Sequence, residues 1–203
     1  MNQAIASILK GYISDLDFVD KIAGFVQSVT FEIGPKDARK QITVPVACCV
    51  DPEECGKEGA YYDLMPNSDY KTVIYFEDKG VTFVRSESNW KYYTSNLRLV
   101  AWINIEKILG SSCKDDSVCT YAAHIIADII RHLPTHPVNI FPFARVYSEI
   151  TDEEVRSNAI FSAYTYDEKH SQYLMSPFDF FAINIKTEFA ICMDSNIPIG
   201  ISC

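Results

Sequence analysis

The sequence contains no long hydrophobic run and little glycine. No apolar stretch approaches the ~18–20 residues that a helix needs to cross a bilayer, and Met1–Lys10 lacks the basic start and apolar segment of a signal peptide. Only 8 of the 203 residues are glycine, and no Walker-type, G-x-G-x-x-G or G-x-S-x-G motif occurs. These absences predict a soluble protein, made inside the cell, without membrane contact and without a glycine-rich phosphate-binding loop.

Basic residues are also few. The chain has 18 Lys+Arg against 27 Asp+Glu, a formal net charge of −9, which argues against a general nucleic-acid binder with a basic face. Two segments, 51–69 and 149–169, hold this excess, with six acids and one base in the first and six acids and two bases in the second. We interpret them either as solvated loops or as surfaces that meet or repel another charged molecule.

The seven cysteines and four histidines do not match a metal-site pattern. An odd number of cysteines without an export signal predicts reduced thiols. Cys49 and Cys55, like Cys113 and Cys119, are separated by five residues, wider than the spacing at which two thiolates share one zinc ion. The sequence therefore predicts no metal, no cofactor and no set of catalytic residues.

Hydrophobic periodicity predicts one domain that mixes helices and strands. Hydrophobic residues make up 48% of the chain, enough for one core in a chain of this length. Helical spacing occurs at 2–27 and 118–133, and alternation at 28–33, 41–50, 71–77, 80–85, 91–105, 138–147 and 178–193. The predicted fold class is α+β over 1–203, with a largely antiparallel sheet, one strong amphipathic helix at 118–133, an N-terminal helical segment packed on it, and long insertions at 51–69 and 149–169.

Three local signals refine this scheme. Asp78-Lys79-Gly80 is predicted to join strands 71–77 and 80–85 as a hairpin turn, because glycine adopts positive φ. Pro45 predicts an edge position or a bulge for strand 41–50, since proline has no N–H to donate. Asp152–Glu154 is predicted to form the first turn of a helix, where acids are stabilising, rather than a general acid–base pair.

Aromatic and acidic side chains gather around the two acidic segments. Tyrosine is favoured where one end of the ring packs and the other stays in water, as at protein–protein interfaces. Ordinary packing at the edge of a sheet would produce the same pattern, and the sequence leaves both interpretations open. The candidate assembly contacts are Tyr61, Tyr62, Glu53, Glu54, Asp152, Glu153, Glu154, Tyr164 and Tyr166.

The order of the predicted elements resembles that of bacteriophage tail-terminator, tail-completion and neck-ring (head–tail connector) proteins. The resemblance is carried by the N-terminal helix, the hairpin Lys71–Arg85, strand Leu97–Ile105, helix Val118–Leu133 and the proline-preceded strand Phe178–Ile191. It covers most of the chain outside the two acidic segments and includes no diagnostic residue motif. It implies a non-enzymatic virion protein, assembled in the host bacterial cytoplasm, that forms a closed ring through sheet edges and long loops.

Two functions therefore stand as expectations. The first is a structural ring in the neck or tail connector, contacting portal, neck-ring or tail proteins while DNA passes through the lumen without specific binding. Acid-rich segments fit that role because they would repel the phosphate backbone, although they would equally fit basic surfaces of neighbouring proteins. The alternative is a small intracellular α+β enzyme or ligand-binding protein whose site is built from residues distant in sequence.

Overall fold

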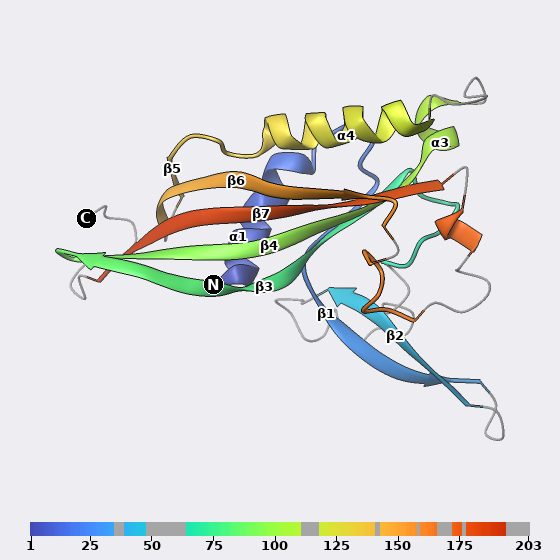
Figure 1. Cartoon of the computed structure of the whole chain (residues 1–203), viewed down its shortest axis with the longest axis horizontal. Helices are drawn as coiled ribbons and strands as arrows, with labels where there is room; N and C mark the ends of the chain where they lie inside the picture. The colour runs from blue at the N-terminus through green and yellow to red at the C-terminus, as the bar shows by residue number, and fades with distance from the viewer. Residues whose placement is uncertain are drawn as a thin grey trace.

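The structure, a computed structural model, describes residues 1–34, 39–47, 64–110, 118–140, 143–157, 159–165, 172–175 and 178–193. One curled sheet of seven strands dominates it, with the strand order β2-β1-β3-β4-β7-β6-β5 (Figure 1). The elements are α1 (Asn2–Ile13), β1 (Lys21–Ile33), β2 (Lys40–Ala47), β3 (Thr72–Glu87), β4 (Trp90–Asn104), α3 (Ile105–Leu109), α4 (Val118–His132), β5 (Val138–Ile140), β6 (Phe143–Val155), the 3-10 turn η2 (Gln172–Leu174) and β7 (Phe178–Cys192).

The predicted fold class is wrong. Strands make up 54% and helices 21% of the structure, and the sheet curls into a half-barrel with only three short helices. A helix does occupy Val118–His132, but it lies on a sheet that supplies most of the fold rather than forming an equal layer. All strand pairs are antiparallel except β1 with β3, which is parallel.

Helices α1 and α4 cover one face of the sheet and enclose the main core. Alternation along β4 and β7 sends Leu97, Leu99, Ile183 and Ile185 to this face, where α4 contributes Ile125. The opposite face has a second core around Trp102 and Tyr75, covered by residues 160–164 and by η2. None of the described helices is long and apolar enough to span a membrane.

The predicted N-terminal helix is too long. Helix α1 ends at Ile13, and β1 begins at Lys21, so the strand takes residues that the spacing assigned to a helix. The pairing of β1 with β3 is irregular between Ile22 and Phe25, yet both side chains pack against the same core. An extra residue in a strand puts two inward side chains three positions apart, which reproduces a helical spacing in the sequence.

The predicted hairpin turn at Asp78-Lys79-Gly80 is also wrong. Strand β3 runs through it without interruption, with a register shift between Asp78 and Val81 relative to β4. Gly80 has φ +97°, and its N–H donates to the Asp78 carboxylate over 2.7 Å. A glycine at positive φ suits a β-bulge as well as a turn, so the residue type alone did not separate the two.

The segment 149–169 is not a loop throughout. Its first seven residues belong to strand β6, which ends at Val155, so Asp152, Glu153 and Glu154 form neither a helix turn nor a loop. A register shift between Ile150 and Asp152 interrupts the alternation. Residues 51–63 and 166–169 lie outside the described part of the chain.

Other local expectations are confirmed or corrected by the pairing. Strand β2, which contains Pro45, lies at an edge of the sheet as predicted. Strand β7 is antiparallel to both neighbours, and its Phe181, Ile183 and Ile185 are buried as the alternation predicted. The expectation that all cysteines are reduced is wrong, because Cys192 is disulfide-bonded.

Candidate functional site

The far ends of β3 and β4 form a hairpin that we call the arm (residues 80–95), in which β4 pairs with β7 and β3 lies on the outer side. Strand β1 pairs with β3 only as far as Phe76 and then continues with β2, so beyond that point β3 lacks a second strand partner among the described residues. Every residue from 80 to 89 is exposed. The side chains include three large apolar ones, Val81 (38% exposed), Phe83 (53%) and Val84 (49%). Figure 1 shows the arm extending beyond both helices.

Aromatic rings fix the arm to the sheet. Phe83 packs edge-on against Tyr93, with ring centroids 5.6 Å apart, and Tyr93 stacks on Phe189 at 5.5 Å. Phe189 in turn meets Phe143 of β6 at 5.1 Å. The row crosses four strands, from buried Phe189 to half-exposed Phe83, so the arm carries an apolar surface outward from the core.

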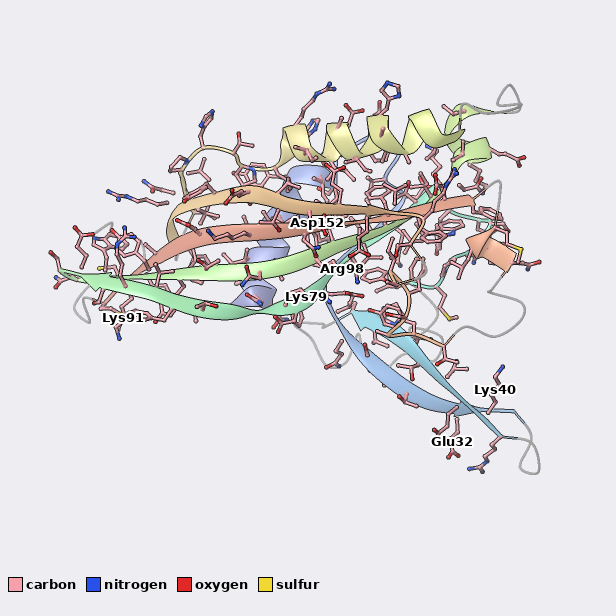
Figure 2. All side chains as sticks on the ribbon, in the orientation of Figure 1. Glu32, Lys40, Lys79, Lys91, Arg98 and Asp152 are labelled. Carbon is pink, nitrogen blue, oxygen red and sulfur yellow. The ribbon has the colours of Figure 1, made fainter. Side chains whose placement is uncertain are left out.

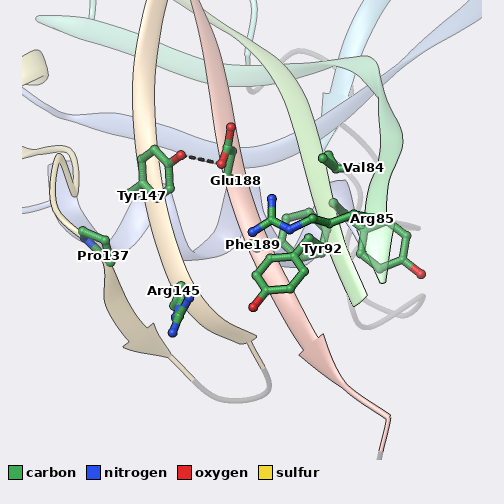
Figure 3. A pocket seen from close by; sticks show the side chains of 9 residues that line it. Val84, Arg85, Tyr92, Pro137, Arg145, Tyr147, Glu188 and Phe189 are labelled. Atoms are coloured by element: carbon green, nitrogen blue, oxygen red, sulfur yellow. Dashed lines mark hydrogen bonds between the residues drawn. The ribbon is translucent and has the colours of Figure 1, made fainter. Parts of the chain in front are cut away.

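A pocket of about 220 Å³ lies against the arm, where Arg85 pairs with Tyr92 near the tip (Figure 3). Arg85 comes from β3 and lies over the ring of Tyr92, with its guanidinium carbon 4.1 Å from the ring centroid, a favourable cation–π geometry. Arg145 enters from the start of β6 on the opposite wall. The complete lining is Val84, Arg85, Tyr92, Tyr93, Pro137, Arg145, Tyr147, Glu188 and Phe189.

The carboxylate of Glu188 in this pocket already has two partners within the subunit. The Tyr147 hydroxyl donates a short hydrogen bond to the Glu188 carboxylate, and the Lys186 ammonium lies 3.2 Å from the same carboxylate. The bond from Tyr147 lowers the pKa of Glu188. The bond to the carboxylate, with burial, raises the pKa of Tyr147 from 10.0 to about 12. Tyr147 therefore remains a neutral donor, and Glu188 remains an ionised acceptor.

The backbone at Arg145 is strained. Its φ is +55°, a conformation that costs a non-glycine residue about 1–3 kcal/mol. A register shift between Ala144 and Tyr147 accompanies it, and the Arg145 N–H donates to Asn139 Oδ1 over 3.3 Å. The guanidinium makes no hydrogen bond or ion pair with the described residues. The bulge therefore places the Arg145 guanidinium at the pocket, where no described residue pairs with it.

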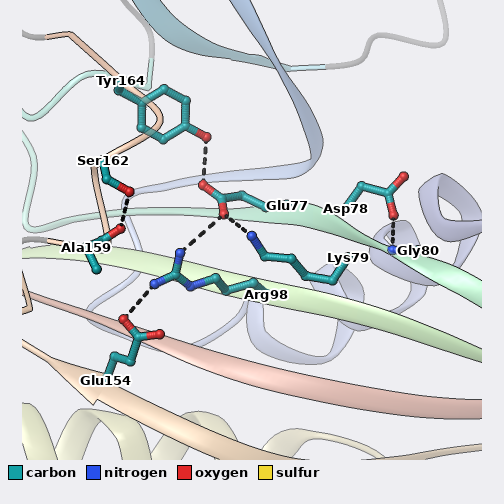
Figure 4. Close-up of polar contacts among 9 residues, drawn as sticks. All are labelled: Glu77, Asp78, Lys79, Gly80, Arg98, Glu154, Ala159, Ser162 and Tyr164. Carbon is teal, nitrogen blue, oxygen red and sulfur yellow. Dashed lines mark hydrogen bonds and ion pairs between the residues drawn. The ribbon is translucent and has the colours of Figure 1, made fainter.

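A second polar cluster lies nearer the covered end of the sheet (Figure 4). Arg98 is 8% exposed, and its guanidinium lies 2.8 Å from the Glu154 carboxylate and 3.7 Å from the Glu77 carboxylate. Tyr164 donates to Glu77 over 2.7 Å, and Lys79 lies 3.4 Å from the same residue. Arg98 Nε is buried without a hydrogen-bond partner in the described part of the chain. The cluster ties the segment after β6 to the sheet.

The candidate assembly contacts separate into three groups. Tyr164 is 9% exposed and belongs to the second core, and Glu154 forms an ion pair with Arg98. Both side chains therefore contact residues of their own subunit. Asp152 and Glu153 are exposed on β6 and make no ion pair with the described residues. Those that lie outside the described residues are Tyr61, Tyr62, Glu53, Glu54 and Tyr166.

The arginines of the pocket carry no recognisable sequence signal. Arg85 and Arg145 lie sixty positions apart, and only the strand order brings their strands to opposite walls of one hollow. Across residues 1–34, 39–47 and 64–193 with their gaps, no group of three or more His, Cys, Asp or Glu side chains could hold a metal ion.

The sequence matches no protein-family model and no curated protein. The functional argument therefore rests on the arm, the pocket and the charges of the sheet.

Proposed function

We propose that this protein is a structural virion subunit of a tailed phage, which assembles with copies of itself into a closed ring in the neck or tail connector. The ring would join portal to tail, contact the neighbouring connector proteins and let DNA pass through its lumen. The observation that carries the proposal is the arm. Its β3 strand is exposed beyond Asp78 and bears the apolar side chains of Val81, Phe83 and Val84.

An arm of this kind favours assembly for a physical reason. Beyond Phe76, β4 is the one described strand that pairs with β3, and leaving three large apolar side chains of β3 in water costs free energy. Burial against another protein removes that cost. The bulges and charges of β3 at Asp78, Lys79 and Arg85 discourage indiscriminate pairing along its edge, so the apolar side chains, rather than the backbone, are the contact surface.

The charge of the chain agrees with passage of DNA. A net charge of −9 disfavours contact with phosphates, because nucleic-acid binding depends on Lys and Arg replacing counterions. A subunit that encloses DNA without binding it benefits from such an excess of acidic residues.

Self-assembly is measured by sedimentation velocity and negative-stain images of the purified full chain. We expect closed cyclic oligomers, and Phe83→Ser should raise the concentration needed for assembly at least tenfold. Met175→Ser is the matched control, because Met175 is 68% exposed and lies outside the arm. Phe83→Ser also removes the ring contact with Tyr93, worth about 0.5–1.5 kcal/mol, so its melting temperature should fall slightly, whereas that of Met175→Ser should change little.

If the protein remains a 23.0 kDa monomer at every concentration, the proposal is contradicted. Assembly that is unaffected by Phe83→Ser would mean that the arm does not carry the contact.

A further inference from the structure

We propose that the pocket beside the arm binds a carboxylate side chain of a second copy, and that the acidic pair Asp152–Glu153 supplies it. The proposal rests on the self-assembly proposed above and assigns one of its contacts. Arg85 and Arg145 would be the acceptor, and the acidic pair on β6 of the next subunit would be the donor.

The pocket has the chemistry of a carboxylate site. The planar guanidinium presents several N–H donors in a fork that matches a carboxylate. The Arg145 guanidinium has no partner among the described residues, whereas Arg85 lies over the Tyr92 ring, 3.7 Å from Glu87, and interacts electrostatically with Glu188. Glu188 is occupied by Tyr147 and Lys186. An acid from outside the subunit would therefore complete the site.

The backbone strain gives a second, independent argument. Arg156 also has positive φ, at 53°, and its guanidinium binds the buried Asp179 through two contacts of 2.8 and 2.9 Å. Arg145 shows the same conformation, but its guanidinium meets no acid in the described structure. Strained residues persist where the surroundings hold them, and they are concentrated at binding sites. By analogy with Arg156, we assign the carboxylate that would pair with the Arg145 guanidinium to another molecule.

The acidic pair likewise lacks a basic partner among the described residues of its own subunit. Asp152 and Glu153 follow the register shift in β6, are both exposed, and form no ion pair with the described residues. They pair with Asn184 and Ile183 and so project to opposite faces of the sheet, so that one of the two carboxylates enters the pocket. Figure 2 shows Asp152 over the middle of the sheet, away from the end of the arm near Lys91. Seven residues of strand separate Arg145 from Asp152, a distance of about 23 Å at the rise of a β-strand. One subunit therefore cannot bring its own pair into its own pocket.

The contact between the pocket of one copy and the acidic pair of another can form in two ways. Across a two-fold axis it would occur twice, with each copy supplying both patches; repeated head to tail, it closes into a ring when the rotation between copies allows it. The ring proposed above uses the head-to-tail arrangement.

The test uses charge reversal in the full chain. Arg145→Glu alone, and Asp152→Lys with Glu153→Lys, should each raise the concentration needed for assembly at least tenfold by placing like charges together. An equimolar mixture of the two variants should assemble at nearly the wild-type concentration, because each then offers the charge that the other lacks. Lys40→Glu, a charge reversal at an exposed residue of edge strand β2 outside the arm and the pocket, is the control.

The outcomes separate the two proposals. Wild-type assembly with no effect of either reversal, or no recovery in the mixture, overturns the pocket assignment and leaves the ring proposal standing. A wild-type chain that never associates overturns the ring proposal itself. Loss of assembly in each variant and recovery in the mixture supports both. Far-ultraviolet circular dichroism of each monomer, at concentrations below assembly, confirms that the substitutions at these exposed positions leave the fold intact.

Discussion

The ion pair between Arg156 and Asp179 should contribute far more to stability than a surface pair of the same length. Asp179 is fully buried at 0% exposure. Its carboxylate accepts hydrogen bonds from Arg156 Nε at 2.8 Å, Arg156 Nη2 at 2.9 Å and the Phe180 N–H at 2.9 Å. Loss of one partner from a buried pair typically costs about 3–5 kcal/mol, because the remaining charge is left without compensation.

Removing Asp179 and removing Arg156 should lower the free energy of unfolding by different amounts. The Arg156 side chain is 41% exposed, so after Asp179→Asn its guanidinium can turn to water, and we expect a loss of about 2–3 kcal/mol, below the range for a fully buried partner. Arg156→Met leaves the Asp179 charge in the core and should cost about 3–5 kcal/mol. The double variant contains no buried charge and should lose less than the sum of the two.

Urea unfolding with linear extrapolation measures these free energies. The matched control is Arg131→Met, which breaks a pair with Asp128 at the same 2.8 Å, but with side chains 73% and 45% exposed; its cost should stay below about 1 kcal/mol. If Asp179→Asn costs no more than Arg131→Met, burial is not what makes the Arg156 pair strong. If Arg156→Met is milder than Asp179→Asn, the uncompensated carboxylate is not the dominant penalty.

Two further expectations test the core and the pocket. Ile125→Asp, at a residue that is 4% exposed in α4, should destabilise severely, whereas Ala123→Asp on the exposed side of the same helix should be mild; equal effects on the melting temperature would mean that the helix faces the sheet differently. Because the raised pKa of Tyr147, about 12, favours its neutral form, the stabilisation from its bond to Glu188 should be full below pH ~10 and lost as the pH rises towards 12. The difference in melting temperature between wild type and Tyr147→Phe should narrow over that range, and a constant difference would contradict the assignment.

The regular strands could be predicted from the sequence, whereas the bulges could not. Alternation identified β4 and β7 nearly to their ends, because every second side chain of these central strands packs against the helices. It failed where a strand gains a residue, as at Ile22–Phe25 and at Gly80, because a bulge shifts the period and imitates a helix or a turn. The fold class followed these errors, since strand residues were assigned to a helix and to a loop.

The candidate site could be predicted only in part. Asp152 and Glu153 were identified as candidate contacts, but their place on a strand depends on pairing with β7, which no local pattern records. Arg85 and Arg145 come together through the order of four strands, and single arginines in strands have no characteristic spacing. Tyr164 was a candidate contact because it lies in an acidic, aromatic segment, and its packing beside Tyr75, with ring centroids 6.2 Å apart, depends on the fold of the whole sheet.

The central pairing of the sheet also has a consequence for how the chain folds. Strands β4 and β7 are in register from Trp90 with Cys192 to Asn104 with Phe178, although α3, α4, β5 and β6 lie between them in the chain. Contacts between residues so distant in sequence require a large loop to close before they stabilise anything, which slows folding. The β3–β4 hairpin can form from local contacts, while the other neighbour of β4, β7, is the last of the described strands to be synthesised. Until β7 arrives, the inner edge of β4 and its apolar face remain unprotected, and that interval is when the nascent chain is most exposed to misassembly.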